Sequence, residues 1–199
     1  MEEEKTMKKV LLDPGHGCYT AGKRSPDGRL REGIYAREIA RRISEELCEG
    51  NIPHEIITPE NADTPLATRV YRANKAHKEW KDGAILISLH SDAKSNSGWG
   101  NARGMSVRVA LNASQNSKTL ARCLYSAWES RGLRVRKYNG DAVPYWPQNL
   151  AICRDTKMPA VLIEMFFHDN REDVGWAMSS EGKSMIVNAI VEGICKFIS

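Results

Sequence analysis

The sequence predicts a single α/β domain built around a mostly parallel sheet, and two observations support this fold class. Residues 9–12, 84–89 and 160–163 are short runs rich in Val, Leu and Ile. Such runs are typical of strands that are buried on both faces of a parallel sheet. Amphipathic patterns with helical spacing separate the runs, and this alternation continues to the end of the 199-residue chain.

Helix and strand signals alternate through the first half of the chain. Ile39, Ile43 and Leu47 recur at four-residue spacing and predict a helix, which Gly50 ends. Thr64 is expected to cap the next helix, because proline follows it at the first helical position. The expected elements are a strand at 8–13, a long Gly- and Ser-rich loop at 17–31, a helix at 35–49, a strand at 53–58, a helix at 65–80 and a strand at 84–90.

The second half continues with longer loops. Residues 91–103 form a polar loop directly after His90, and residues 139–149 form a loop that carries Tyr145 and Trp146 between prolines. Asn170 is placed to cap a short helix. The remaining expected elements are strands at 104–111, 150–154 and 160–165 and helices at 117–130, 171–178 and 184–197.

Composition restricts the class of protein. No apolar stretch approaches the roughly 18 residues of a membrane span. Residues 1–5 are acidic, where a signal peptide would begin with basic residues. We therefore expect a disordered leader at 1–7, a catalytic domain at 8–199, and cytoplasmic synthesis without a signal peptide. The five cysteines include no CxxC pair, which predicts neither a disulfide scaffold nor a thiolate metal site.

A net charge of +4 mildly favours contact with polyanions. The densest basic run, residues 131–137, lacks the interleaved aromatic residues of a single-strand binder. A solvated surface segment explains this run equally well. We therefore expect no nucleic-acid partner.

Metal-ligating residues follow the three apolar runs. His16 comes shortly after the first run, His90 ends the second and Glu164 ends the third. Ligand sites of open parallel sheets lie beyond the carboxyl ends of the strands, so these side chains should share one edge. Two imidazoles and a carboxylate at one edge suggest a zinc hydrolase, in which zinc has three protein ligands and one open position. Cys18, two residues after His16, is an alternative nucleophile or ligand, although no base with an orienting partner surrounds it.

The third metal ligand is expected to be a carboxylate from another element. Glu32, at the junction of the long loop and the first helix, fits best, and Glu38 is the competitor. Glu164 is then the expected general base. Its carboxylate lies within an apolar strand, where partial desolvation of a charge without a partner costs free energy, so a purely structural role is harder to explain. Other divalent metals remain open, because nitrogen and oxygen ligands accept several.

The remaining histidines and aromatic residues carry weaker signals. His54 on a strand and His77 on a Lys-rich helix are interpreted as structural or solvated. His168 follows Glu164 by four residues and is a candidate substrate contact. The aromatic candidates for packing against sugar or peptide, which equally could anchor their loops, are Trp99, Tyr145 and Trp146.

The chain resembles the zinc-dependent N-acetylmuramoyl-L-alanine amidases of the amidase-3 type. The matching segments, in family order, are VLLDPGHG at 10–17, GRLRE at 28–32, RVYRAN at 69–74, LISLHSDA at 86–93, RGM at 103–105 and PAVLIE at 159–164. By this resemblance, His16, Glu32 and His90 bind zinc and Glu164 is the catalytic carboxylate. It also implies a mostly parallel six-stranded sheet flanked by helices. The implied reaction is hydrolysis of the amide between N-acetylmuramic acid and the L-alanine of the stem peptide.

The chain departs from the family pattern after Glu164. A Gly-Phe and a Ser-Asn usually follow there, whereas this chain has MFFHDN at 165–170, in which Asn170 keeps a capping residue. Without a recognisable signal peptide, the chain resembles a phage or prophage endolysin more than a secreted division enzyme. We expect a monomer that acts on peptidoglycan at the cell wall. The alternatives are a zinc amidase or peptidase acting on another amide, and a non-catalytic wall-binding module.

Overall fold

The computed structural model describes residues 7–95, 98–139 and 143–199. The expected leader at 1–7 therefore lies, except for Met7, outside the described residues. A six-stranded sheet with the strand order β2-β1-β3-β6-β4-β5 forms the centre of a single α/β domain, as expected. Its strands are β1 (Lys9–Pro14), β2 (His54–Ile56), β3 (Ala84–Asp92), β4 (Ser106–Ala110), β5 (Trp146–Gln148) and β6 (Ala160–Phe167).

The sheet is parallel except where β4 meets β6. β1 pairs in parallel with both β2 and β3, and β3 pairs in parallel with β6. β4 runs antiparallel to β6, with Ser106 opposite Glu164 and Arg108 opposite Leu162. The edge strand β5 is parallel to β4. The mostly parallel sheet inferred from the apolar runs is thus confirmed.

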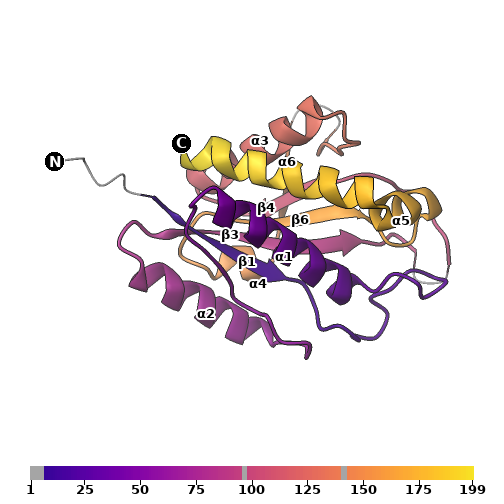
Figure 1. Ribbon diagram of the computed structural model, residues 1–199, viewed down its shortest axis with the longest axis horizontal. Helices are drawn as coiled ribbons and strands as arrows, with labels where there is room; N and C mark the ends of the chain where they lie inside the picture. The colour runs from indigo at the N-terminus through magenta and orange to yellow at the C-terminus, as the bar shows by residue number, and fades with distance from the viewer. Residues whose placement is uncertain (1–6, 96–97, 140–142) are drawn as a thin grey trace.

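Helices cover both faces of the sheet (Figure 1). One layer contains α1, α3 and α6, and the other contains α2 and α4. The helices are α1 (Glu32–Glu49), α2 (Leu66–Glu79), α3 (Gln115–Ser130), α4 (Ala151–Arg154), α5 (Arg171–Met178) and α6 (Ser180–Ile198). Within the described part of the chain, no helix is both long and apolar enough to cross a membrane.

Two apolar clusters fill the spaces between the sheet and its helices. The larger one packs α1, α3 and α6 against one face, with Ile39, Ile43 and Trp128 fully buried. The smaller one lies under α2 and α4 and includes Leu11 and Leu86. Successive β-strand residues face opposite sides, so Val10 and Leu12 belong to the first cluster while Leu11 belongs to the second. This burial of both faces explains the continuous apolar runs in the sequence.

Several expected element boundaries were wrong. The segment 150–154, expected as a strand, contains the short helix α4, and β5 lies inside the expected loop at 139–149. Residues 140–142 of that loop lie outside the described residues. α2 begins at Leu66 with Pro65 as its N-cap residue, so Thr64 does not cap it. Thr64 instead donates a hydrogen bond to Glu60 Oε1 at 2.8 Å. β3 and β6 also run two residues beyond their expected ends, because their backbones stay paired past His90 and Glu164.

Candidate metal centre

His16 lies in the turn that follows β1. Its backbone has a φ of +54°, a left-handed conformation that is uncommon for a residue with a side chain. The preceding residue must be glycine, because a Cβ atom at position 15 would lie 2.3 Å from Cε1 of His90 and would clash with it. The turn therefore brings the imidazole of His16 close to that of His90, with ring centroids 5.0 Å apart in an edge-to-face arrangement.

Glu32 is the first residue of α1, and only 1% of its surface is exposed. The loop before it folds back on itself, with Ser25 N donating to the carbonyl of Leu30 at 2.9 Å. The next residue, Gly33, packs so tightly that an added Cβ would lie 2.1 Å from the carbonyl oxygen of Gly17. Close packing of the loop against the turn after β1 thus places the Glu32 carboxylate beside His16.

His90 completes the cluster from within β3. Its Nδ1 lies 3.0 Å from Glu32 Oε1, and Nε2 of His16 lies 3.6 Å from the same oxygen. Candidate ligand atoms of the three residues all lie within 4.8 Å of one another. The structure therefore brings together the three residues that the sequence pointed to, and Glu32 is preferred over Glu38. The Glu38 carboxylate instead pairs with Arg42 and Lys183.

The charge states of His16 and Glu32 suit a cation, whereas the pKa of His90 is raised, because the hydrogen bond and charge of Glu32 outweigh the opposing effect of burial. Burial lowers the pKa of His16 from 6.5 to about 4, so its imidazole is neutral at neutral pH. Burial alone would raise the pKa of Glu32, but the hydrogen bond and charge of His90 lower it to about 2. Glu32 Oε2 is buried and has no hydrogen-bond partner among the described residues. Two imidazoles and one carboxylate, which has an oxygen that accepts no hydrogen bond, form a donor set that fits a divalent metal.

Glu164 lies directly beside this cluster, because it is the β6 partner of His90 in the sheet register. Burial raises the pKa of Glu164 from 4.5 to about 7, although the charges of His90 and Arg108 oppose the shift. Its Oε2 atom has no hydrogen-bond partner in the described structure. A carboxyl group with a pKa near neutrality can both accept and release a proton at pH 7.

Arg108 is a residue that sequence reasoning missed. Its Nε lies 3.4 Å from Glu164 Oε1, and its guanidinium also contacts Asp92 and Gln148. A signal for it was present, since an arginine stands between two valines in the strand at 106–110. The contact with Glu164 depends on the antiparallel pairing of β4 with β6, which the local pattern did not reveal.

A polar cleft of about 760 Å³ opens over the cluster. His168 lines it but is itself buried, and its Nδ1 lies 2.9 Å from the hydroxyl of Ser91. Asp169, also buried, anchors the loop after β3 by accepting bonds from the backbone N–H groups of Lys94 and Ser95. Residues lining the cleft are His16, Ala21, Gly22, Lys23, Arg24, Ser25, Pro26, Glu32, His90, Ser91, Asp92, Ala93, Ser95, Gly98, Glu164, His168 and Asp169.

The aromatic substrate candidates do not line this cleft. Tyr145 is buried in the larger apolar cluster, and Trp99 packs against that cluster under the guanidinium of Arg171. Trp146 donates to the carbonyl of Arg136 at 3.3 Å and lies against that residue's guanidinium. Each of the three rings therefore has packing or hydrogen-bond contacts within the fold.

The other candidates also have contacts of their own. Cys18 donates to Asn61 Oδ1 at 3.3 Å. His54 contacts Ser44, and His77 accepts a bond from the backbone N–H of Ala84. Both histidines therefore have the structural contacts that their sequence context suggested.

Known proteins share this arrangement of strands and helices. An N-acetylmuramoyl-L-alanine amidase from Clostridium difficile 630 superposes with a TM-score of 0.82 at 23% identity, covering 96% of this chain and 97% of that one. The amidase Ami1 from Mycobacterium smegmatis gives a TM-score of 0.82 at 20% identity, covering 98% and 99%.

Sequence comparison reaches the same family. The probable cell wall amidase LytH of Staphylococcus epidermidis is 26% identical over 197 residues, covering 96% of this chain. The chain spans only 59% of the length of that relative. Residues 10–196 match the family model described as N-acetylmuramoyl-L-alanine amidase, Amidase_3. Because the match covers nearly the whole chain, this protein belongs to the Amidase_3 family.

Proposed function

We propose that this chain is a zinc-dependent amidase that cleaves the amide between N-acetylmuramic acid and the L-alanine of the peptidoglycan stem peptide. The observation that carries the proposal is the convergence of His16, Glu32 and His90 beside the buried carboxyl of Glu164. Family membership and the cell wall amidase relative support the substrate class. The proposed catalytic domain comprises residues 8–199, and its proposed partner is peptidoglycan at the cell wall.

The three proposed ligands would give a bound zinc ion a defined role in the reaction. Zinc held by His16, Glu32 and His90 would polarise the scissile carbonyl and lower the pKa of a water molecule. A hydrogen bond from the Ser91 backbone N–H, 3.0 Å long, fixes Glu32 Oε1. Such outer contacts orient a ligand side chain before a metal arrives.

Glu164 is the proposed general base. It accepts a proton from the attacking water and passes it to the nitrogen of the departing L-alanine. Its raised pKa, caused mainly by burial, suits both transfers near neutral pH. Arg108, on the other side of the carboxylate, restricts its orientation and favours the ionised form.

The cleft is the proposed substrate-binding site. Its polar lining includes the cationic Lys23 and Arg24 together with His168 and Asp169. These groups suit a glycopeptide, which carries hydroxyl, amide and carboxylate groups. His168 is proposed to contribute by shaping the cleft wall, since its Nδ1 is already engaged with Ser91.

Digestion of purified peptidoglycan tests the proposal. Protein loaded with zinc is incubated with sacculi, and the soluble products are analysed by mass spectrometry. We expect free stem peptides with an L-alanine amino terminus, lost on chelation and restored by zinc. A Glu164→Gln variant serves as the matched control, because it should bind the same metal without releasing peptides.

Two other outcomes would contradict the proposal. Zinc binding with intact glycan–peptide linkages would indicate an enzyme for another amide, which soluble acyl-amino acids would identify. Binding to sacculi without zinc uptake or release of amino groups would indicate a wall-binding module.

A further inference from the structure

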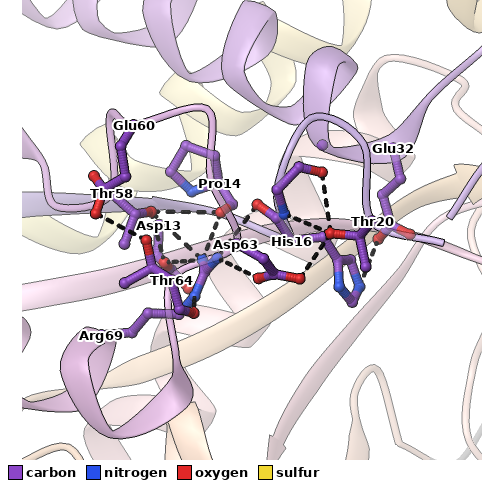
Figure 2. Close-up of polar contacts among 12 residues, drawn as sticks. Asp13, Pro14, His16, Thr20, Glu32, Thr58, Glu60, Asp63, Thr64 and Arg69 are labelled. Carbon is purple, nitrogen blue, oxygen red and sulfur yellow. Dashed lines mark hydrogen bonds and ion pairs between the residues drawn. The ribbon is translucent and has the colours of Figure 1, made fainter.

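Arg69 of α2 lies beneath the turn that carries His16 (Figure 2). Only 4% of its side chain is exposed. Its Nη1 donates to the carbonyl of Pro14 at 2.6 Å, and its Nη2 donates to the carbonyl of His16 at 3.3 Å. Its Nε donates to the carbonyl of Thr64 at 2.8 Å. One guanidinium thus joins the end of β1 to the loop before α2.

A buried carboxylate holds this guanidinium in place. Asp13 of β1 is 1% exposed, and its Oδ1 accepts from Arg69 Nη1 at 2.7 Å. The hydroxyl of Thr58 donates to the same oxygen at 3.0 Å, and the hydroxyl of Ser88 donates to Oδ2 at 2.7 Å. Both carboxylate oxygens are therefore bonded, which a buried charge requires. The pair has a fixed position relative to β1 and β3.

The backbone of His16 needs such support. Its φ of +54° is a conformation that a non-glycine residue keeps only when its surroundings enforce it. In this conformation, the carbonyl faces Arg69 while the imidazole lies beside Glu32 and His90. A second restraint comes from Thr20, which accepts a bond from the backbone N–H of Gly17 and donates to Asp63.

We propose that Arg69, anchored by Asp13, is a positioning residue that sets the orientation of the His16 peptide and so aims this imidazole into the metal centre. The inference rests on the proposed metal centre but not on the identity of the substrate. Arginine suits the role because its planar group donates five hydrogen bonds in fixed directions, whereas the three donors of lysine are clustered on one atom.

The test compares two arginines of the same helix. Arg72 also bonds the loop before α2, through the carbonyl of Ile57 at 2.9 Å and Glu60 Oε1 at 2.6 Å, but it has no contact with His16 in the described structure. Arg69→Lys and Arg72→Lys both keep the positive charge. The Zn²⁺ dissociation constant of each is measured by competition with a chromophoric chelator, and metal-free stability by denaturant unfolding.

The proposal predicts that Arg69→Lys weakens Zn²⁺ binding on the order of tenfold to a hundredfold, as for other groups that orient metal ligands. Arg72→Lys should stay within about threefold of wild type. Bound Co²⁺ supplies a second readout, since its visible absorption reports ligand geometry. We expect an altered Co²⁺ spectrum at saturation in Arg69→Lys and an unchanged one in Arg72→Lys.

Thr58→Val provides a second test if Arg69→Lys does not fold, because this substitution changes no charged group. Thr58→Val removes one hydroxyl from the Asp13 carboxylate and leaves both charges, and it should weaken Zn²⁺ binding severalfold. Zinc affinity and a Co²⁺ spectrum like those of wild type in the folded variants would overturn the positioning role. Failure of the wild-type protein to bind zinc would instead overturn the proposed metal centre, so the two failures are distinguishable.

Discussion

Arg108 and Glu164 form an ion pair in which Nε of the arginine lies 3.4 Å from Oε1 of the carboxylate. The pair joins antiparallel strands, since Arg108 on β4 sits across from β6. Both side chains are largely buried, with 16% of the Arg108 side chain and 12% of the Glu164 side chain exposed to solvent. The cation thus favours ionisation of a carboxyl group whose burial disfavours it.

Replacing Arg108 by glutamine should therefore reduce turnover more than substrate binding. We expect kcat on soluble muramoyl peptides to fall about tenfold, because a misoriented or protonated Glu164 is a poorer base, while KM changes little. Gln148→Ala is the control, since Gln148 contacts the same arginine from the exposed side. A change in KM alone would mean that Arg108 binds substrate rather than orienting the base.

Glu164→Gln removes the proposed general base while keeping the size of the side chain. Loss of general-base catalysis typically costs 10²–10⁴-fold, so kcat should fall by about that amount. Zinc stoichiometry, measured on the same samples, should stay at one per chain, because the three proposed ligands are intact. Turnover within a few-fold of wild type would show that another group accepts the proton.

Gly15→Ala should damage the metal centre, although it replaces none of the three proposed ligands. The new Cβ would lie 2.3 Å from Cε1 of His90, so the ring must move. We expect zinc affinity to fall at least about tenfold, and metal-free stability to fall by about 1–3 kcal/mol from overpacking.

The matched control for that substitution is Gly175→Ala. Apart from the neighbouring residues and the local helix backbone, no atom of the described residues lies within 4 Å of a Cβ placed there, and alanine is the better helix former in α5. Its stability should be equal or slightly raised, with zinc affinity unchanged. Equal zinc affinity in both glycine variants would refute the close approach of Gly15 and His90.

The buried carboxyl of Glu164 also makes metal-free stability depend on pH. Its folded pKa of about 7 lies above the ordinary value of 4.5, so its contribution to stability is present below about pH 4.5 and is lost as pH rises through about 7. Relative to Glu164→Gln, the metal-free wild type should lose on the order of 2 kcal/mol between pH 5 and pH 8.

Denaturant unfolding of both proteins at the two pH values, in chelator, measures this difference. Other titrating groups are common to both proteins and cancel in the comparison. A difference that is the same at pH 5 and pH 8 would mean that the Glu164 carboxyl is well solvated in the metal-free protein.

Local patterns were sufficient for the strands and helices that carry the candidate site. The apolar runs that became β1, β3 and β6 are buried on both faces, and strands buried in this way have consecutive apolar residues in the sequence. The edge strand β5 and the short helix α4 have no recognisable sequence pattern, because three or four residues are too few to show a hydrophobic periodicity. Their conformation depends on β4 and on α2, which they pack against.

The sequence by itself determined the class of fold and which side chains are candidates to hold a metal. His16, Glu32, His90 and Glu164 are recognisable as candidate ligands and a candidate base because each lies at or near one end of an element. Only the tertiary structure decided which groups support them. Arg69 reaches the carbonyl of His16 from 53 residues away, and Arg108 reaches Glu164 through an antiparallel pairing. Such contacts depend on how distant segments pack, and local sequence periodicity contains no record of that packing.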